Sequence, residues 1–208
     1  MILIGVIWML TTLILYINVA KMKKDRKILN VGCGNETYGT DFIDLYPSRS
    51  EVKKVFIGKE RFPYKNDFFD EVYSNCVLEH LVDIGHFIKE CKRVLKKNGK
   101  IIIITDNAAC YKFHIHFFPH SKGAHHGRYE ILGRVGGGTG KSSEDKHYSL
   151  FTPTHLKNLF DYYGIKTESL EYLFGYKRNR INKILDFLMS LVDRDIVHPQ
   201  IKIIGQNV

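Results

Sequence analysis

The segment Lys27–Asp44, KILNVGCGNETYGTDFID, places a glycine-rich turn at a short distance from an acid. A short apolar run leads into Gly32 and Gly34, and a second apolar run ends in Asp44. This pattern predicts a strand, a tight turn, and a second strand with a carboxylate at its carboxyl end. Glycine lets a ligand approach the backbone closely, and such a carboxylate can accept hydrogen bonds from both hydroxyls of a ribose. The segment therefore favours a site for a nucleoside-containing cofactor.

The spacing within this segment argues against a dinucleotide. The letters GCGNET contain no third glycine at the Gly-x-Gly-x-x-Gly position, and the acid follows Gly34 after about ten residues rather than about twenty. Nothing in the segment is obviously built to cradle a pyrophosphate. A glycine pair alone also occurs in ordinary tight turns, so that alternative stays open at this point.

Two residues elsewhere in the chain could take a proton from a substrate. Asp106 follows the run KIIIIT, which is the most strand-like in the chain, and His147 lies within DKHYSLFT. A histidine near a pocket can act as a base at neutral pH, so both residues are candidate catalytic groups. The structural alternative is that Asp106 caps a loop and His147 packs against its neighbours.

The segment between these two residues carries two patterns that suggest other chemistry. GRVGGGTGKSS is not a phosphate-binding loop, because Val135 stands where the first glycine of that motif is required. The histidine-rich part has no acid or thiol at a recognised ligand spacing, so we predict no metal site. The histidines of this part are His114, His116, His120, His125 and His126.

We expect residues 107–148 to form a lid over the pocket.

The elements that must position these residues can be read from hydrophobic patterning. The expected order is four strands, then three helices that each precede a further strand, which fits an α/β fold with a mostly parallel sheet and a final antiparallel strand. Asp83 and Thr152 are expected N-caps, and Asn98-Gly99 an expected C-cap. The expected strands are 28–31, 42–44, 54–57, 69–73, 100–105, 165–174 and 201–204, and the expected helices are 84–97, 153–163 and 179–192.

The third expected helix, 179–192, has an apolar stripe and basic residues at its start. An apolar stripe on a helix usually packs against a sheet, and we predict that arrangement here. The alternative is that the helix lies on a membrane surface. The stripe consists of Ile181, Ile184, Leu185, Leu188 and Leu191.

Residues 1–20 contain no charged side chain, and the segment KMKKDRK follows them directly. About twenty helical residues span the hydrocarbon core of a bilayer, and the positive-inside rule places the basic segment in the cytoplasm. The sequence therefore predicts a single-pass membrane anchor over 1–20 and a cytoplasm-facing domain over 21–208. A buried or amphipathic N-terminal helix is the alternative.

The composition is that of a globular protein with a preference for anionic partners. The 208 residues are 44% hydrophobic and carry a formal net charge of +9, which suits acidic headgroups, phosphorylated substrates or nucleic acid. No dense basic run with interleaved aromatics indicates nucleic acid specifically. The four cysteines form no C-x-x-C pair, which favours reduced thiols.

Four stretches in this order resemble the class I S-adenosylmethionine-dependent methyltransferases, near the type 11 group. They are LNVGCG, RFPYKNDFFDEVYSNCVLEHL, CKRVLKKNGKIIII and FTPTHLKNLFDYYGI, and the resemblance covers roughly residues 27–175. It implies a Rossmann-like, mostly parallel seven-stranded sheet flanked by helices, with S-adenosylmethionine as cofactor. Asn30 stands where this family usually has an acid, and Phe62 stands in place of leucine.

The resemblance also implies which residues hold the cofactor. The glycine turn would contact the methionine part and Asp44 the ribose, while Phe62 and Pro63 would flank the adenine. Asn75, Cys76 and His80 would lie near the methyl donor. The full set of expected contacts is Asn30, Gly32, Cys33, Gly34, Asp44, Leu45, Phe62, Pro63, Asn75, Cys76 and His80.

Taken together, the sequence predicts a membrane-anchored methyltransferase that acts on a small or lipid-linked acceptor, for example a saccharide. The Asn-Pro-Pro-Tyr type of motif, typical of amino methylation, is absent, which favours an oxygen acceptor. One alternative is a nucleic-acid methyltransferase, which predicts a contiguous basic face around the pocket. Another is a non-catalytic membrane scaffold with a degenerate cofactor site.

Overall fold

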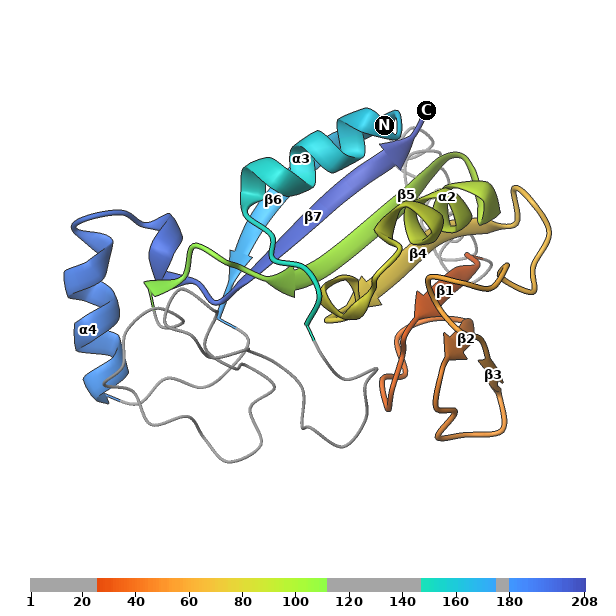
Figure 1. Cartoon of the computed structure of the whole chain (residues 1–208), viewed down its shortest axis with the longest axis horizontal. Coiled ribbons are helices and arrows are strands. Elements are labelled where there is room, and N and C mark those ends of the chain that lie inside the picture. Colours follow the sequence, from red (N-terminus) through yellow and green to blue (C-terminus); the bar gives the residue numbers. More distant parts are fainter. Residues whose placement is uncertain (1–25, 112–146, 175–179) are drawn as a thin grey trace, which may run out of the picture.

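The computed structural model describes residues 26–111, 147–174 and 180–208, and these residues build one seven-stranded sheet (Figure 1). The strand order is β3-β2-β1-β4-β5-β7-β6, and β7 is antiparallel to both of its neighbours while the other pairs are parallel. The predicted order of elements and the antiparallel last strand are therefore confirmed. The strands are β1 (Ile28–Val31), β2 (Asp41–Asp44), β3 (Val52–Lys54), β4 (Phe69–Asn75), β5 (Leu95–Asp106), β6 (Ile165–Leu173) and β7 (Gln200–Asn207).

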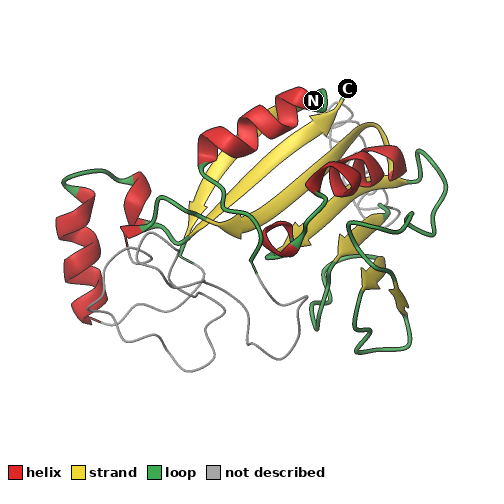
Figure 2. Ribbon diagram, in the orientation of Figure 1, coloured by secondary structure: helices red, strands yellow, loops and turns green. Residues whose placement is uncertain are grey.

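Two helices cover one face of the sheet (Figures 1 and 2). Helix α2 (Ile84–Val94) joins β4 to β5, and α3 (Pro153–Tyr162) precedes β6. The α3 helix lies directly on β7, because a Cβ atom at Gly205 would come within 2.7 Å of the Phe160 ring. The core lies between these helices and the sheet. Its largest fully buried side chains include Phe69, Phe87, Phe160, Leu95 and Leu156.

The first four strands are joined by loops in which the structure has no helix: residues 32–40, 45–51 and 55–68. Parallel strands usually need a longer crossover that contains a helix. Here Gly39 permits the short return from β1 to β2, because it has a φ of +132° and its ideal Cβ would lie 3.2 Å from the carbonyl oxygen of Ile28. The loop 55–68 contributes residues 56–59 to the edge of the sheet where the candidate site lies.

The helix starts agree with the sequence, but two boundaries differ. Asp83 accepts a hydrogen bond from the backbone N–H of His86, and Thr152 accepts one from that of His155, so both predicted N-caps are confirmed. The predicted C-cap at Asn98-Gly99 is wrong. Helix α2 ends at Val94 because the fully buried Leu95 already pairs with Phe69 as part of β5. The third strand is Val52–Lys54 rather than 54–57.

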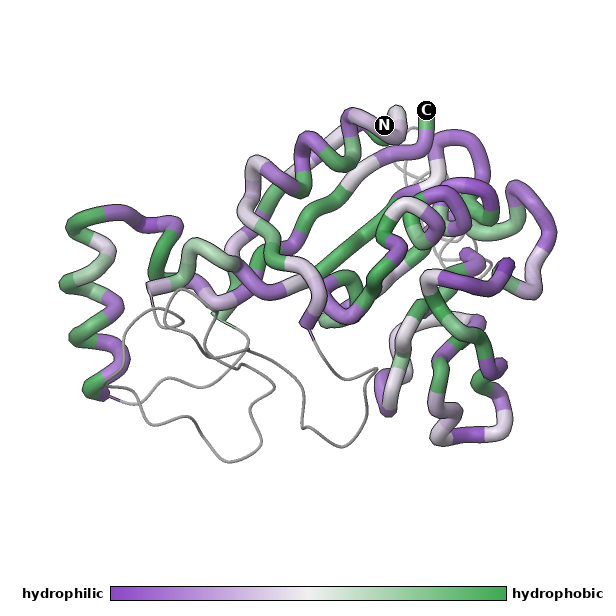
Figure 3. The backbone as a smooth tube through the Cα atoms, in the orientation of Figure 1, coloured by the Kyte–Doolittle hydropathy of each residue, from purple (hydrophilic) through white to green (hydrophobic). Residues whose placement is uncertain are grey.

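Helix α4 (Arg180–Ser190) corrects a second prediction. Its apolar stripe does not pack on the sheet, since Ile181 and Ile184 are 67% and 61% exposed. The side chain that the helix buries fully is Asp186, which is 3% exposed. Figure 3 shows the hydrophobic run of β5 within the sheet, and it shows hydrophobic and hydrophilic residues alternating along α4 at one end of the molecule.

No helix among the described residues is both long enough and apolar enough to cross a bilayer. The predicted anchor, residues 1–20, lies outside the described part of the chain. Most of the predicted lid, the histidine-rich part and the glycine-rich segment 133–143 also lie outside it.

Candidate cofactor and catalytic site

The glycine turn and Asp44 form one hydrogen-bonded unit at the carboxyl ends of β1 and β2. The backbone N–H of Gly34 donates to Asp44 Oδ2 at 2.8 Å, and the N–H of Tyr46 donates to Oδ1 at 2.8 Å. Gly32 has a φ of +71°, and a Cβ atom there would lie 2.3 Å from Val77. Gly34 has a φ of +49°, and the space where its Cβ would stand is open. Asp44 is therefore held in one orientation beside backbone that a ligand can approach.

A cavity of about 840 Å³ opens at this end of the sheet. Ligand pockets in proteins usually measure roughly 300–1,000 Å³, so the cavity could hold a nucleoside cofactor together with a small acceptor. The wall comes from the ends of β1 and β2, from residues 56–59, and from the segment that includes the 3-10 helix η1 (Leu78–His80). Tyr148 completes it. The lining residues are Gly32, Asp44, Leu45, Tyr46, Phe56, Ile57, Gly58, Lys59, Cys76, Val77, His80, Leu81, Val82, Asp83, His86 and Tyr148.

Phe62 and Pro63, which were predicted to flank the adenine, lie away from the cavity. Phe62 is 1% exposed and belongs to the hydrophobic core, where its backbone N–H donates to Glu90 of α2 at 2.8 Å. Pro63 is exposed, and neither residue lines the cavity. Phe56 and Ile57, six residues earlier in the chain, form this part of the wall instead. The sequence reasoning missed them because the family motif draws attention to Phe62.

Asn30 is fully buried and does not line the cavity either. Its side-chain N–H donates to the carbonyl oxygen of Tyr38 at 2.9 Å and to Glu36 Oε2 at 3.3 Å. Glu36 Oε1 accepts a second hydrogen bond, from the side-chain amide of Asn75 at 2.7 Å. The carboxylate of Glu36 thus links β1 to β4 beside the glycine turn. No motif in the sequence identified Glu36.

The two cysteines predicted to contact the cofactor occupy different environments. Cys33 is buried within the glycine turn, whereas Cys76 lines the cavity and accepts a hydrogen bond from Gln200 Nε2 at 3.1 Å. Burial raises the pKa of the Cys76 thiol, and the nearby carboxylates of Glu79 and Asp106 raise it further. The raised pKa disfavours the thiolate form of Cys76, which is the nucleophilic form of a cysteine.

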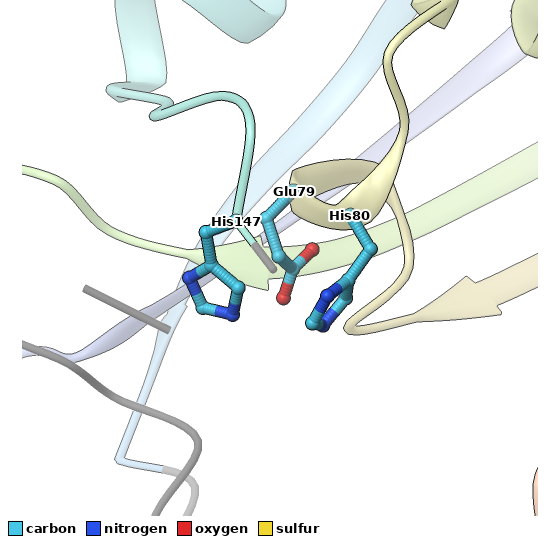
Figure 4. A group of neighbouring side chains, drawn as sticks. All are labelled: Glu79, His80 and His147. Carbon is cyan, nitrogen blue, oxygen red and sulfur yellow. The ribbon is translucent and has the colours of Figure 1, made fainter. Parts of the chain in front are cut away.

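The other end of the site brings together residues that are far apart in the sequence (Figure 4). The rings of His80 and His147 meet edge to face with centroids 4.6 Å apart. His147 Nδ1 lies 4.0 Å from Asp106 Oδ2, and both side chains are 4% exposed. The segment around His147 is tied to η1, because the N–H of Tyr148 donates to the carbonyl oxygen of Glu79 at 2.8 Å. The two predicted catalytic residues therefore lie side by side, next to the cavity wall formed by His80.

The same region contains donor atoms that metal ions accept. One ligand atom from each of Glu79, His80 and His147 lies within 4.8 Å of the others, and the same holds for Cys76, Glu79 and Asp106. Histidine, cysteine and carboxylate ligands bind zinc at about 2.0–2.3 Å, so the side chains would have to move closer to share one ion. Glu79 Oε2 already accepts a hydrogen bond from the Thr105 hydroxyl at 2.8 Å. The prediction of no metal site stays a prediction.

Comparison with known proteins decides the family. Residues 29–103 match the model of a family described as a methyltransferase domain. Over these residues the chain is a class I S-adenosylmethionine-dependent methyltransferase domain. The resemblance is confirmed, and the match includes the first two sequence stretches and nearly all of the third. S-adenosylmethionine is the methyl donor of the family.

Curated relatives of this methyltransferase match only part of it. A ubiquinone biosynthesis O-methyltransferase of Bradyrhizobium diazoefficiens is 28% identical over 101 residues, which are 39% of this chain and 40% of that protein. A probable S-adenosylmethionine-dependent methyltransferase of Mycobacterium tuberculosis is 29% identical over 121 residues, 48% of this chain and 43% of that protein. The chain thus spans less than half the length of these relatives.

Solved structures share the fold over a larger part of the chain. A methyltransferase of Archaeoglobus fulgidus covers 95% of this methyltransferase with a TM-score of 0.59 and 15% identity, and 93% of that chain is matched. One from Mesorhizobium loti covers 86% with a TM-score of 0.53 and 16% identity, and 90% of that chain is matched. The predicted Rossmann-like sheet is confirmed, in the form of a mixed seven-stranded sheet.

Proposed function

We propose that this protein transfers a methyl group from S-adenosylmethionine to an oxygen atom of a small or lipid-linked acceptor, for example a saccharide. The observation that carries the proposal is the layout of the cavity. Asp44, Gly32 and His80 line the same cavity. His80 contacts His147, and His147 lies beside Asp106. This arrangement supports a site with a nucleoside-binding end at Asp44 and a proton-accepting end beside His80.

The residues at the first end fit the methyl donor. The two carboxylate oxygens of Asp44 each accept one backbone hydrogen bond and keep further acceptor capacity for the two ribose hydroxyls. The open space at Gly34 lets the methionine part approach the backbone. Phe56 and Ile57 offer an apolar wall for the adenine. The bound cofactor supplies an electrophilic methyl group on a sulfonium, so no phosphate cradle is needed.

The residues at the second end would handle the acceptor. An acceptor hydroxyl that attacks the methyl carbon forms an O–C bond as the S–C bond breaks, and it must lose its proton. His147 would take that proton, and Asp106 would hold the ring and offset the charge that forms. Much of the rate acceleration would come from holding donor and acceptor in line, which requires no further chemistry from the protein.

The lining of the cavity bears on the alternatives. It contains one lysine, Lys59, and two acids, Asp44 and Asp83. A nucleic-acid methyltransferase would need a basic face around the pocket to hold phosphates, and this mixed lining favours a small or lipid-linked acceptor instead. The apolar segment 1–20 and the basic residues after it support a single-pass membrane protein whose domain faces the cytoplasm.

Calorimetric titration with S-adenosylmethionine and S-adenosylhomocysteine tests the donor site. We expect the Asp44→Asn variant to bind both ligands at least about tenfold more weakly, because it loses charge-assisted hydrogen bonds to the ribose. Asp41→Asn is the matched control, since Asp41 begins the same strand at the opposite end. A folded wild-type protein that binds neither ligand would instead support the scaffold alternative.

A further inference from the structure

Helix α4 presents an unusual distribution of side chains. Six large apolar residues on the helix and the turn that follows are more than half exposed, while its fully buried residue is an acid. Within the helix they recur at spacings of three and four residues, so they form one face. They are Ile181, Ile184, Phe187, Leu188, Leu191 and Val192, and we refer to them as the α4 apolar face.

The opposite side of the helix is fixed to the rest of the molecule by polar contacts. The Tyr111 hydroxyl donates to Asp186 Oδ1 at 2.8 Å, and this hydrogen bond is buried. Tyr111 follows closely after Asp106, which ends β5. The side chain of Asn107 donates to the carbonyl oxygens of Asp195 and His198, which holds the segment after α4 at the same place. The buried hydrogen bond of Asp186 and the Asn107 contacts after the helix therefore help to hold α4 with its apolar face outward.

The charges on the exposed side of α4 suit an anionic lipid surface. Arg180 and Lys183 are exposed and flank the α4 apolar face, whereas Asp186 points the other way. Long basic side chains at the border of an apolar face let the charged groups reach lipid headgroups while the apolar residues enter the acyl boundary. Asp193 and Asp195 are also exposed, but they lie beyond the helix.

We propose that the α4 apolar face docks onto the surface of an anionic membrane. The net charge of +9 favours such a surface at longer range. The uncharged segment 1–20 with its basic flank would bring the protein to a bilayer by a separate contact. Because α4 lies beyond the carboxyl ends of β4 and β5 (Figure 1), docking would turn the catalytic end of the sheet towards the lipid. The docking itself does not depend on the proposed methyl transfer.

A tryptophan reporter on α4 tests this proposal in the full-length protein. The chain has one tryptophan, Trp8, so Trp8→Phe combined with Phe187→Trp leaves a single reporter on the α4 apolar face. With phosphatidylglycerol vesicles, we expect its emission to shift to shorter wavelength and to be quenched by doxyl-labelled lipid. Phosphatidylcholine vesicles should give a much weaker response. The control is Trp8→Phe combined with Tyr162→Trp, since Tyr162 is 82% exposed on α3. The tryptophan at position 162 should stay unquenched.

A double variant of the α4 apolar face separates docking by α4 from attachment by residues 1–20. Ile184→Ser with Leu188→Ser should reduce quenching of the α4 reporter about tenfold or more at a given lipid concentration, even where the protein still sediments with vesicles. Three results would overturn the proposal. The reporter could stay unquenched on vesicle-bound protein, its emission could already be shifted in a dimer without lipid, or it could be shifted in a lipid-free monomer. The last two would mean that a second copy, or another part of the chain, covers the face.

Discussion

Glu36 is a residue beside the candidate site that family motifs do not reveal. It follows the glycine turn by two positions and accepts hydrogen bonds from Asn30 and Asn75, which lie on neighbouring strands. Asn30 stands where the family usually has an acid, and a carboxylate from the loop contacts its side chain. The sequence showed the unusual Asn30. It did not show the contact with Glu36, which depends on how the loop folds back.

We expect Glu36→Gln to weaken binding of both S-adenosylmethionine and S-adenosylhomocysteine about tenfold. The side-chain N–H group of the glutamine would face the N–H group of at least one asparagine, so at least one hydrogen bond would be lost. Hydrogen bonds to a charged acceptor contribute about 1.5–3 kcal/mol. Isothermal titration calorimetry measures the change. Glu51→Gln is the control, since Glu51 is an exposed acid in the next loop. Equal loss in both variants would mean that Glu36 has no positioning role.

At the scale of elements, an ion pair within α2 holds the loop before β4 through hydrogen bonds. Glu90 Oε2 accepts a hydrogen bond from Arg93 Nη2 at 2.6 Å, and the same oxygen accepts the N–H of Phe62 at 2.8 Å. Arg93 also donates to the carbonyl oxygen of Phe62 at 3.0 Å. These contacts help to hold Phe62 in the core rather than on the cavity wall. Hydrophobic patterning predicted α2 and its start at Asp83, but it could not indicate which aromatic residue the helix would anchor.

The Glu90 contacts make stability depend on pH. Burial acts to raise the pKa of the carboxyl group, but the hydrogen bonds from Arg93 and from the Phe62 backbone outweigh it and hold the pKa below its ordinary value of 4.5. The ionised form therefore stabilises the fold above that value, and this contribution is lost as the pH falls through the lowered pKa.

We expect Glu90→Gln to lower the free energy of unfolding by about 1.5–3 kcal/mol at pH 7, with a difference from wild type that shrinks below about pH 4.5. Urea denaturation at a series of pH values measures both quantities. Glu168→Gln removes an exposed ion pair with Lys100 and should change stability by less than about 1 kcal/mol. A difference for Glu90→Gln that stays constant down to pH 3 would contradict the assignment.

At the scale of the whole molecule, the site is assembled from two separate parts of the chain. Residues between 32 and 86 form nearly all of the cavity lining, whereas Asp106 and His147 lie beside the wall at His80. The sequence predicted His80, Asp106 and His147 individually. It could not predict that His147 would contact His80, because the intervening stretch has no periodic pattern from which to place the chain. Likewise, the outward-facing stripe of α4 has the spacing of a buried helix, and only the buried Asp186 reveals its orientation.

This division predicts that donor binding and turnover can be separated. His147→Gln should reduce kcat by about 10²–10⁴ on an accepted substrate while the affinity for S-adenosylmethionine changes little, because His147 would act on the acceptor proton. A coupled assay for S-adenosylhomocysteine release, together with calorimetry, measures the two quantities. His155→Gln, on exposed α3 surface, is the control. Unchanged kcat in His147→Gln would assign the proton to another group.

The position of β7 has a consequence for how the molecule is made. Strand β6 pairs only with β7 among the described strands, and β7 lies between β6 and β5 although it is synthesised after both. During translation, β6 and the α3 helix packed near it therefore have no place in the sheet until residues 200–207 have left the ribosome. The part from β1 to β5 can pair earlier. Nascent chains should thus carry an open β5 edge and an unpaired β6, a state that invites association with other chains or with chaperones.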